Sequence, residues 1–302
     1  MPIWIPVTLM AALCQCWRTA KQQKLRAVLS VNGATFIRFL YGVPAALAFL
    51  LIGIAVGGGA LPVPTWRMFA YAAAGGLSQI LATALMIMAF GYRNFAVGTA
   101  YAKTETAQTA IVALLVLHEA LRPLAWVGIA IGLSGVLTLS LAGRGLRPGQ
   151  FLGGTFQPAA LSGMAAGFFF AITAVFIKLG SQAETGASLF VRALFLVFVT
   201  TTLQTLMHGA FLALRHPDEL RKTLHAWRDA SWVGLLSSAG SACWFTGFAL
   251  TDVALVRSVG QIEVVFTLLF GRFYLKERLK PGDARGLVLV VVGVVLIVLG
   301  GR

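Results

Sequence analysis

The stretch LHEALRPLAWVGIAIGLSG, residues 117–135, recurs in the same chain as LKERLKPGDARGLVLVVVG, residues 275–293. The two copies lie 158 residues apart, and the same shift aligns residues 94–144 with residues 252–302 without a gap. Matches of glutamate, proline and glycine carry the comparison, because apolar sequences match leucine to leucine by chance. These matches are Glu119 with Glu277, Pro123 with Pro281, Gly128 with Gly286, and Gly135 with Gly293. The chain therefore contains an internal repeat.

The composition is that of a membrane protein. Of 302 residues, 58% are hydrophobic and 11% are charged, and the mean hydropathy is +0.85. Soluble domains carry about 25% charged residues. The formal net charge is +14, but the basic residues sit between apolar runs. This pattern favours contact with anionic lipid headgroups and the cytoplasmic face over binding to nucleic acid.

Ten apolar segments are long enough to cross a bilayer, given that about nineteen residues span roughly 30 Å of hydrocarbon. The first is expected to be retained as a span, because no Lys or Arg precedes it as in a signal peptide. The polar segment His216–Asp229 is expected to be a solvated loop. The ten candidates are residues 3–22, 35–56, 67–90, 95–117, 124–142, 157–179, 186–213, 230–250, 253–275 and 284–300.

Each half of the chain holds five of these segments, so the sequence divides into repeats at residues 1–145 and 146–302. Because five is odd, two consecutive copies enter the membrane from opposite sides, as in many secondary transporters. With a small shift of register, Lys21 and Arg38 of the first half correspond to Lys178 and Arg192 of the second. The predicted fold is therefore an all-α membrane protein of about ten transmembrane helices in two inverted five-helix repeats.

Glycines in the fifth and tenth spans predict close helix contact there. They are Gly128, Gly132, Gly135, Gly286 and Gly293.

Two carboxylates lie near mid-membrane, Glu105 in the fourth span and Glu263 in the ninth. A lone carboxylate at that depth is costly, so each should face a wet cavity, meet a cation or be protonated. Helical spacing places Tyr101, Gln108 and Thr109 on the face of Glu105, and Thr267 repeats this relation to Glu263. The interpretation left open beside a ligand site is a buried ion pair or hydrogen-bonded acid that fixes helix packing.

The lysines and arginines near these spans each allow more than one role. Lys103 lies two residues from Glu105, on another face, so it is expected to contact a neighbouring helix or the cavity rim. Arg18, Arg38 and Arg192 fit snorkelling or helix-end anchoring as well as ligand contact. The complete set of candidate substrate or proton-coupling residues is Gln15, Arg18, Tyr101, Lys103, Glu105, Gln108, Thr109, Gln261, Glu263 and Thr267.

No catalytic, metal or cofactor site is expected. The three cysteines, Cys14, Cys16 and Cys243, lie in apolar segments and are interpreted as small buried hydrophobic residues. His208, His216 and His225 do not match a metal-ligand spacing.

The loop charges favour termini outside the cytoplasm. Loops after odd-numbered spans carry fifteen of the assigned lysines and arginines, and the other side carries five. The positive-inside rule places the richer side in the cytoplasm.

The stretch Leu275-Lys-Glu-Arg-Leu279, followed by Pro281, Gly286 and Gly293, resembles the ending of EamA-type domains of the drug/metabolite transporter superfamily. A weaker copy ends the first half. The resemblance implies a ten-helix exporter or importer of amino acids, nucleobases, sugars or related metabolites, with a central cavity and often proton coupling. Members usually have cytoplasmic termini, contrary to the charge count, and Arg18 stands where a small residue is usual.

The expected function is a secondary active transporter, acting as an exporter of small polar metabolites across the bacterial inner membrane by alternating access. The alternatives are a membrane-embedded enzyme, a channel or a non-transporting scaffold. The expected partners are a small-molecule substrate and membrane lipids, with a homodimer left open.

Overall fold

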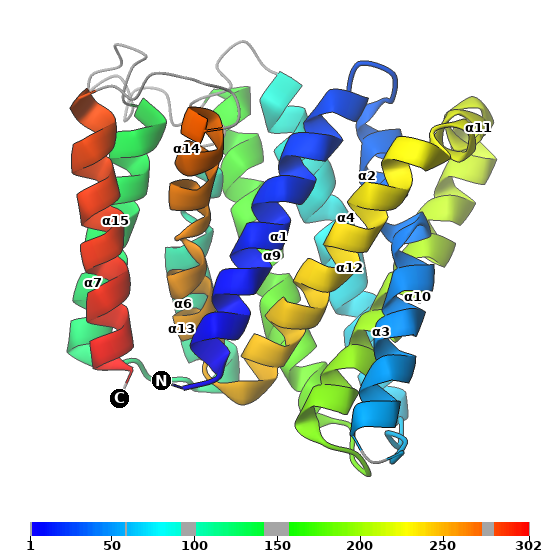
Figure 1. Ribbon diagram of the computed structural model, residues 1–302, viewed down its shortest axis with the longest axis horizontal. Coiled ribbons are helices and arrows are strands. Elements are labelled where there is room, and N and C mark those ends of the chain that lie inside the picture. The colour runs from blue at the N-terminus through cyan, green and yellow to red at the C-terminus, as the bar shows by residue number, and fades with distance from the viewer. Residues whose placement is uncertain (1, 58, 92–100, 142–156, 274–280, 302) are drawn as a thin grey trace. The chain divides into compact units, whose positions relative to one another are not determined.

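The computed structural model describes residues 2–57, 59–91, 101–141, 157–273 and 281–301 (Figure 1). These residues form helices joined by short connections, with one isolated β-bridge between Val63 and Thr185. Five helical segments of the described part are long and apolar enough to cross a membrane, and three shorter apolar helices accompany them. The predicted all-α membrane fold is confirmed.

Proximity divides the chain into two compact units, and each unit takes helices from both sequence halves. Unit 1 comprises Met1–Ile80 and Thr173–Thr251, and unit 2 comprises Leu81–Ile172 and Asp252–Arg302. Two long helices, α4 (Trp66–Gly91) and α9 (Pro158–Gln182), pass from one unit into the other.

Unit 1 is built from α1 (Trp4–Leu25), α2 (Val31–Leu40), α3 (Gly42–Val56), α10 (Leu189–Arg215), α11 (Pro217–His225) and α12 (Trp227–Leu250). Helix α1 packs along α12, and α2, α3, α10 and α12 contact one another. Backbones approach closely at Gly234, where an added Cβ would lie 2.3 Å from the Tyr41 carbonyl carbon. The Ser238 hydroxyl donates a hydrogen bond of 2.7 Å to the Gly42 carbonyl, which fixes α12 against the start of α3.

Unit 2 contains α6 (Glu105–Leu117), α7 (Pro123–Leu141), α13 (Val253–Gly260), α14 (Glu263–Phe273) and α15 (Pro281–Gly300). Helices α7 and α15 lie side by side (Figure 1). An added Cβ at Gly293 would lie 2.6 Å from the Gly132 Cα, and one at Gly135 would lie 2.6 Å from the Val290 nitrogen. The close helix contact predicted from the glycines is confirmed.

The shift of 158 residues also relates the helix starts. It relates α6 to α14, α7 to α15, and α2 to α10. Ser30 and Ser188 both cap their helices, each accepting a hydrogen bond from the backbone three residues later. In this register Arg192 matches Ala34 and Arg38 matches Leu196. Arg38 and Arg192 correspond only with a shift of four residues from this register, which is the small shift that the sequence comparison assumed.

The sequence predicted a solvated loop after α10, but the structure has a helix in this polar segment. It contains α11, which has Pro217 in its first turn, acidic residues at its start and basic residues at its end. The Tyr41 hydroxyl donates to the Thr223 carbonyl at 3.0 Å and holds α11 in place. His208 lies before this segment, buried in α10 among the rings of Phe36, Phe39 and Phe211.

The connection between α9 and α10 buries an acid. Glu184 is fully buried, and neither carboxylate oxygen has a hydrogen-bond partner among the described residues. Arg192 donates instead to the backbone carbonyl of Glu184. Burial, opposed by the positive charge of Arg192, raises the pKa of Glu184 to about 8.

Candidate functional site

Both glutamates that were predicted near mid-membrane lie where a helix is interrupted. The sequence predicted continuous helices over 95–117 and 253–275, whereas the structure has turns at residues 103–104 and 261–262. At these turns the Thr104 and Gln261 nitrogens bond to carbonyls three residues back, at 3.1 and 3.2 Å. Such tightened turns inside a span often mark a functional hinge. Residues 92–100 lie outside the described part.

The interruptions place each acid at the start of a new helix. Glu105 is the first residue of α6, and Glu263 is the first residue of α14. A carboxylate at a helix N-terminus is favoured by the partial positive charge of the unpaired backbone N–H groups. The two breaks are therefore equivalent in position and in chemistry.

Each acid pairs with a cation from the other sequence half. Arg257 Nη1 lies 2.9 Å from Glu105 Oε1, and Lys103 Nζ lies 3.3 Å from Glu263 Oε2. All four residues belong to unit 2. We refer to these contacts as the crossed ion pairs. They match the sequence expectation that Lys103 contacts a neighbouring helix rather than Glu105.

The crossed ion pairs are largely shielded from solvent. The exposed fractions of the side chains are 10% for Arg257, 19% for Glu105, 27% for Lys103 and 13% for Glu263. The Lys103–Glu263 contact is a hydrogen bond, whereas the Glu105 Oε1 contact with Arg257 is short without meeting hydrogen-bond geometry. That second pair is therefore held by charge attraction, and the Glu105 oxygen retains capacity to accept a hydrogen bond.

The residues around the first break are only partly gathered. Gln108 donates to the Thr104 hydroxyl at 2.8 Å and to the Met164 carbonyl at 3.4 Å. Tyr101 is buried beside Ala160. Thr109 is fully buried, and its hydroxyl has no hydrogen-bond partner among the described residues.

The second break differs in its polar side chains. Gln261 is buried against Gly132, and neither amide atom has a hydrogen-bond partner within the described ranges. Thr267 is exposed, and its hydroxyl donates to the backbone carbonyl of Glu263 at 2.9 Å. Thr267 therefore does not repeat the environment of Thr109.

The remaining predicted site residues lie on α1, in unit 1. Gln15 accepts a hydrogen bond of 3.2 Å from the Trp244 indole. Arg18 is 5% exposed and Arg38 is 3% exposed. Both side chains are covered by protein, whereas the choice between helix-end anchoring, snorkelling and ligand contact stays a prediction.

Sequence reasoning missed Arg257, the partner of Glu105. It was counted among the loop charges, although it lies inside an apolar run only six residues before Glu263. An intramembrane cation near an intramembrane acid was the signal available. Glu119, one of the repeat matches, accepts a hydrogen bond of 2.8 Å from the Val253 nitrogen at the start of α13. Its counterpart Glu277 lies outside the described residues.

Within the described ranges, no group of three His, Cys, Asp or Glu side chains is arranged to hold a metal ion. The three cysteines are not joined in disulfides.

Comparison with known proteins places the chain in a family. The sequence profile of the EamA-like transporter family matches residues 2–141 and 157–299. A solved crystal structure, described only as that of a protein, superposes with a TM-score of 0.69 at 19% sequence identity and covers 98% of each chain. At this identity the likeness supports the fold alone. No curated protein matches the sequence significantly.

Proposed function

Because the chain belongs to the EamA-like transporter family, we propose that it is a secondary active transporter that exports small polar metabolites across the bacterial inner membrane. The observation that carries the proposal is the pair of equivalent helix breaks joined by the crossed ion pairs. Interrupted helices at corresponding positions of inverted repeats are where such transporters bind substrates and coupling ions. The family assignment favours a carrier over a membrane-embedded enzyme.

The crossed ion pairs supply a means of coupling. Each pair joins a residue of the first half to a residue of the second, so breaking a pair releases one half from the other at that point. A proton on Glu105 would remove its attraction to Arg257, and a proton on Glu263 would do the same for Lys103. Alternatively, an ammonium group of the substrate would displace one of the cations. Alternating access then follows from making and breaking these contacts as the cavity changes its exposure.

Polar groups near the breaks support recognition of a metabolite. The free capacity of Thr109 and Gln261 to form hydrogen bonds adds one hydroxyl and one amide to the charged groups. A few oriented polar groups of this kind are what a small polar ligand requires. We propose that both glutamates face one water-accessible cavity during the cycle.

The test begins with a thermal-shift screen of the purified protein against amino acids, nucleobases and sugars. A stabilising compound is then used as the labelled substrate in proteoliposomes with an imposed pH gradient. We expect saturable, gradient-dependent uptake. Chemical conversion of the compound would indicate an enzyme and would contradict the proposal.

Substitution of the acids tests the site itself. Glu105→Gln and Glu263→Gln keep the side-chain shape and remove the ionisable group, so accumulation against a gradient should fall at least tenfold while the protein remains folded. Asp218→Asn on α11 is the control, because Asp218 is 87% exposed and distant from the breaks in sequence. If both Gln variants accumulate substrate like the parent with an unchanged pH profile, the acids are packing elements only.

A further inference from the structure

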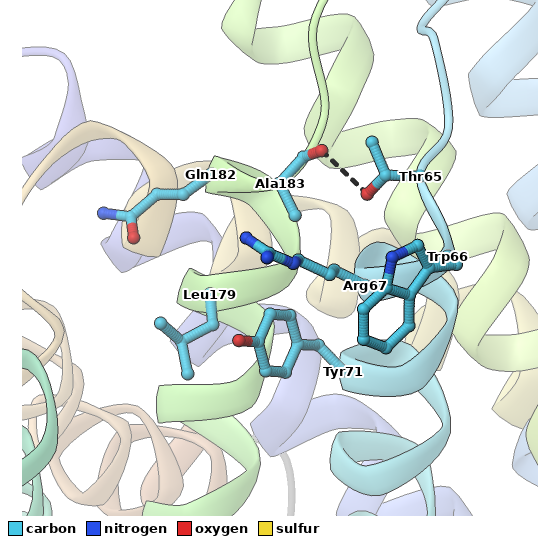
Figure 2. A pocket seen from close by; sticks show the side chains of 7 residues that line it. All are labelled: Thr65, Trp66, Arg67, Tyr71, Leu179, Gln182 and Ala183. Carbon is cyan, nitrogen blue, oxygen red and sulfur yellow. Dashed lines mark hydrogen bonds between the residues drawn. The ribbon is translucent and has the colours of Figure 1, made fainter.

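A cavity of about 500 Å³ lies within unit 1, where α4 begins and α9 ends (Figure 2). Its walls are fixed by local hydrogen bonds. The Thr65 hydroxyl donates to the Ala183 carbonyl at 3.0 Å, and the Val63 nitrogen donates to the Thr185 carbonyl at 2.8 Å. The residues that line the cavity are Thr65, Trp66, Arg67, Tyr71, Leu179, Gln182 and Ala183.

The cavity is open to its surroundings, and one exposed cationic side chain, Arg67, lines it. The guanidinium of Arg67 extends between Tyr71 and Gln182 (Figure 2). No acidic residue lines the cavity, and Arg67 makes no ion pair with the residues that the structure describes. The Tyr71 hydroxyl and the Gln182 amide add hydrogen-bond donors. This set of groups suits an anion, and a guanidinium binds phosphate through two parallel hydrogen bonds.

The cavity also lies at the end of two candidate membrane spans. One span begins at Trp66 and the other ends at Gln182. Apolar side chains beside it face outward: Trp66 is 75% exposed, Leu61 67% and Val63 55%. A tryptophan and an arginine next to each other at the end of a span are typical of the depth at which lipid headgroups lie.

We propose that this cavity binds the phosphate group of an anionic phospholipid. Arg67 holds the phosphate oxygens, Tyr71 and Gln182 donate further hydrogen bonds, and Trp66 covers the glycerol and upper acyl chain. The site is separate from the crossed ion pairs, and its occupancy does not depend on transport. A soluble phosphate ester offers the same anionic group, so the experiment must distinguish the two sources.

The experiment uses full-length protein that has been freed of lipid in a maltoside detergent. Binding of phosphatidylglycerol is measured by native mass spectrometry and by thermal shift, with phosphatidylcholine and inorganic phosphate in parallel. We expect phosphatidylglycerol to bind preferentially to the parent. Arg67→Gln should weaken that binding about tenfold, because it removes a charge-assisted contact. Arg67→Lys should give an intermediate loss, because it keeps the charge and removes the paired geometry.

Arg221→Gln is the matched control, since Arg221 is an exposed cation on α11 and 78% accessible. Its phosphatidylglycerol binding should equal that of the parent. The proposal is overturned if Arg67→Gln binds phosphatidylglycerol as strongly as the parent does. If inorganic phosphate stabilises the parent but not Arg67→Gln, while phosphatidylglycerol shows no preference over phosphatidylcholine, the lipid source is wrong and the site belongs to a soluble phosphate.

Discussion

At the scale of single residues, each cation and carboxylate of the crossed ion pairs compensates the buried charge of its partner. Removing one partner of a largely buried pair leaves a charge without compensation, which costs far more than replacing both partners. The ion pair between Arg257 and Glu105 should therefore show a coupling energy between substitutions of its two partners that is larger than that of an exposed ion pair.

We expect Arg257→Gln and Glu105→Gln each to destabilise the protein by on the order of 3 kcal/mol. The double variant should lose about 1–3 kcal/mol less than the sum of the two. The measurement is thermal or denaturant unfolding in detergent. The exposed pair Arg221 and Asp218, whose atoms lie 4.0 Å apart, is the control and should show coupling under about 0.5 kcal/mol. Strictly additive losses at Arg257 and Glu105 would contradict a direct interaction.

Glu184 provides a second residue-scale prediction, in the connection between two spans. Burial raises the pKa of its carboxyl from 4.5 to about 8, although Arg192 opposes the shift. The folded state therefore holds a proton more tightly than the unfolded state. Its stabilising contribution is complete below about pH 4.5 and is lost as the pH rises to about 8.

Glu184→Gln mimics the protonated form, so it should match the parent in melting temperature near pH 5 and exceed it near pH 8–9. Melting curves across this range would check the prediction. Parallel curves for the variant and the parent at every pH would show that Glu184 does not titrate between the two states.

At the scale of elements, the helices were predictable where hydropathy decides them. The apolar runs for α7 and α15 gave both spans and their glycine contact faces. The breaks at residues 103–104 and 261–262 were not predictable in this way, because a hydropathy window of about nineteen residues averages over the polar residues that surround them. The helical stripe from Tyr101 to Thr109 assumed an unbroken helix, and a turn alters the angle between residues on its two sides.

The contact between α7 and α15 gives an element-scale prediction. At Gly293 an added Cβ would meet backbone atoms of Gly132 at 2.6 Å, so Gly293→Ala must push the two helices apart. We expect a loss of about 1–3 kcal/mol, measured as a lower melting temperature. Gly240→Ala is the control, because its nearest neighbour, Cys14 Cβ, would lie 3.4 Å away. Equal melting temperatures for the two variants would contradict tight packing of this pair.

At the scale of the whole molecule, the repeat was readable from sequence and the spatial units were not. Identical residues at a constant spacing reveal the duplication. The spatial units leave no such pattern, because unit 1 depends on contacts between distant helices such as α1 and α12. The site was predicted in part. Glu105, Glu263 and Lys103 were identified from their depth in apolar spans, but pairing between halves depends on tertiary contacts that no local pattern encodes.

The membrane orientation gives the prediction for the whole chain. The sequence count of fifteen basic residues after odd-numbered spans against five on the other side includes residues that lie inside helices, among them Arg18, Lys21 and Lys24 of α1 and Arg257 of α13. Without these four residues the count is still uneven, and it predicts that both termini lie outside the cytoplasm. Alkaline phosphatase fused after Arg302 should therefore be active, and green fluorescent protein fused there should be dark. The reverse pattern would contradict the prediction and would indicate cytoplasmic termini, which are usual in EamA-type transporters.

The packing of α1 on α12 has a consequence for biosynthesis. About 200 residues separate the end of α1 from the start of α12, and at roughly 5–20 residues per second a ribosome needs some 10–40 s to produce them. During that interval the nascent α1 lacks the helix that later packs along it. The first helix therefore depends on the translocon or an insertase to shelter it until the eighth span arrives.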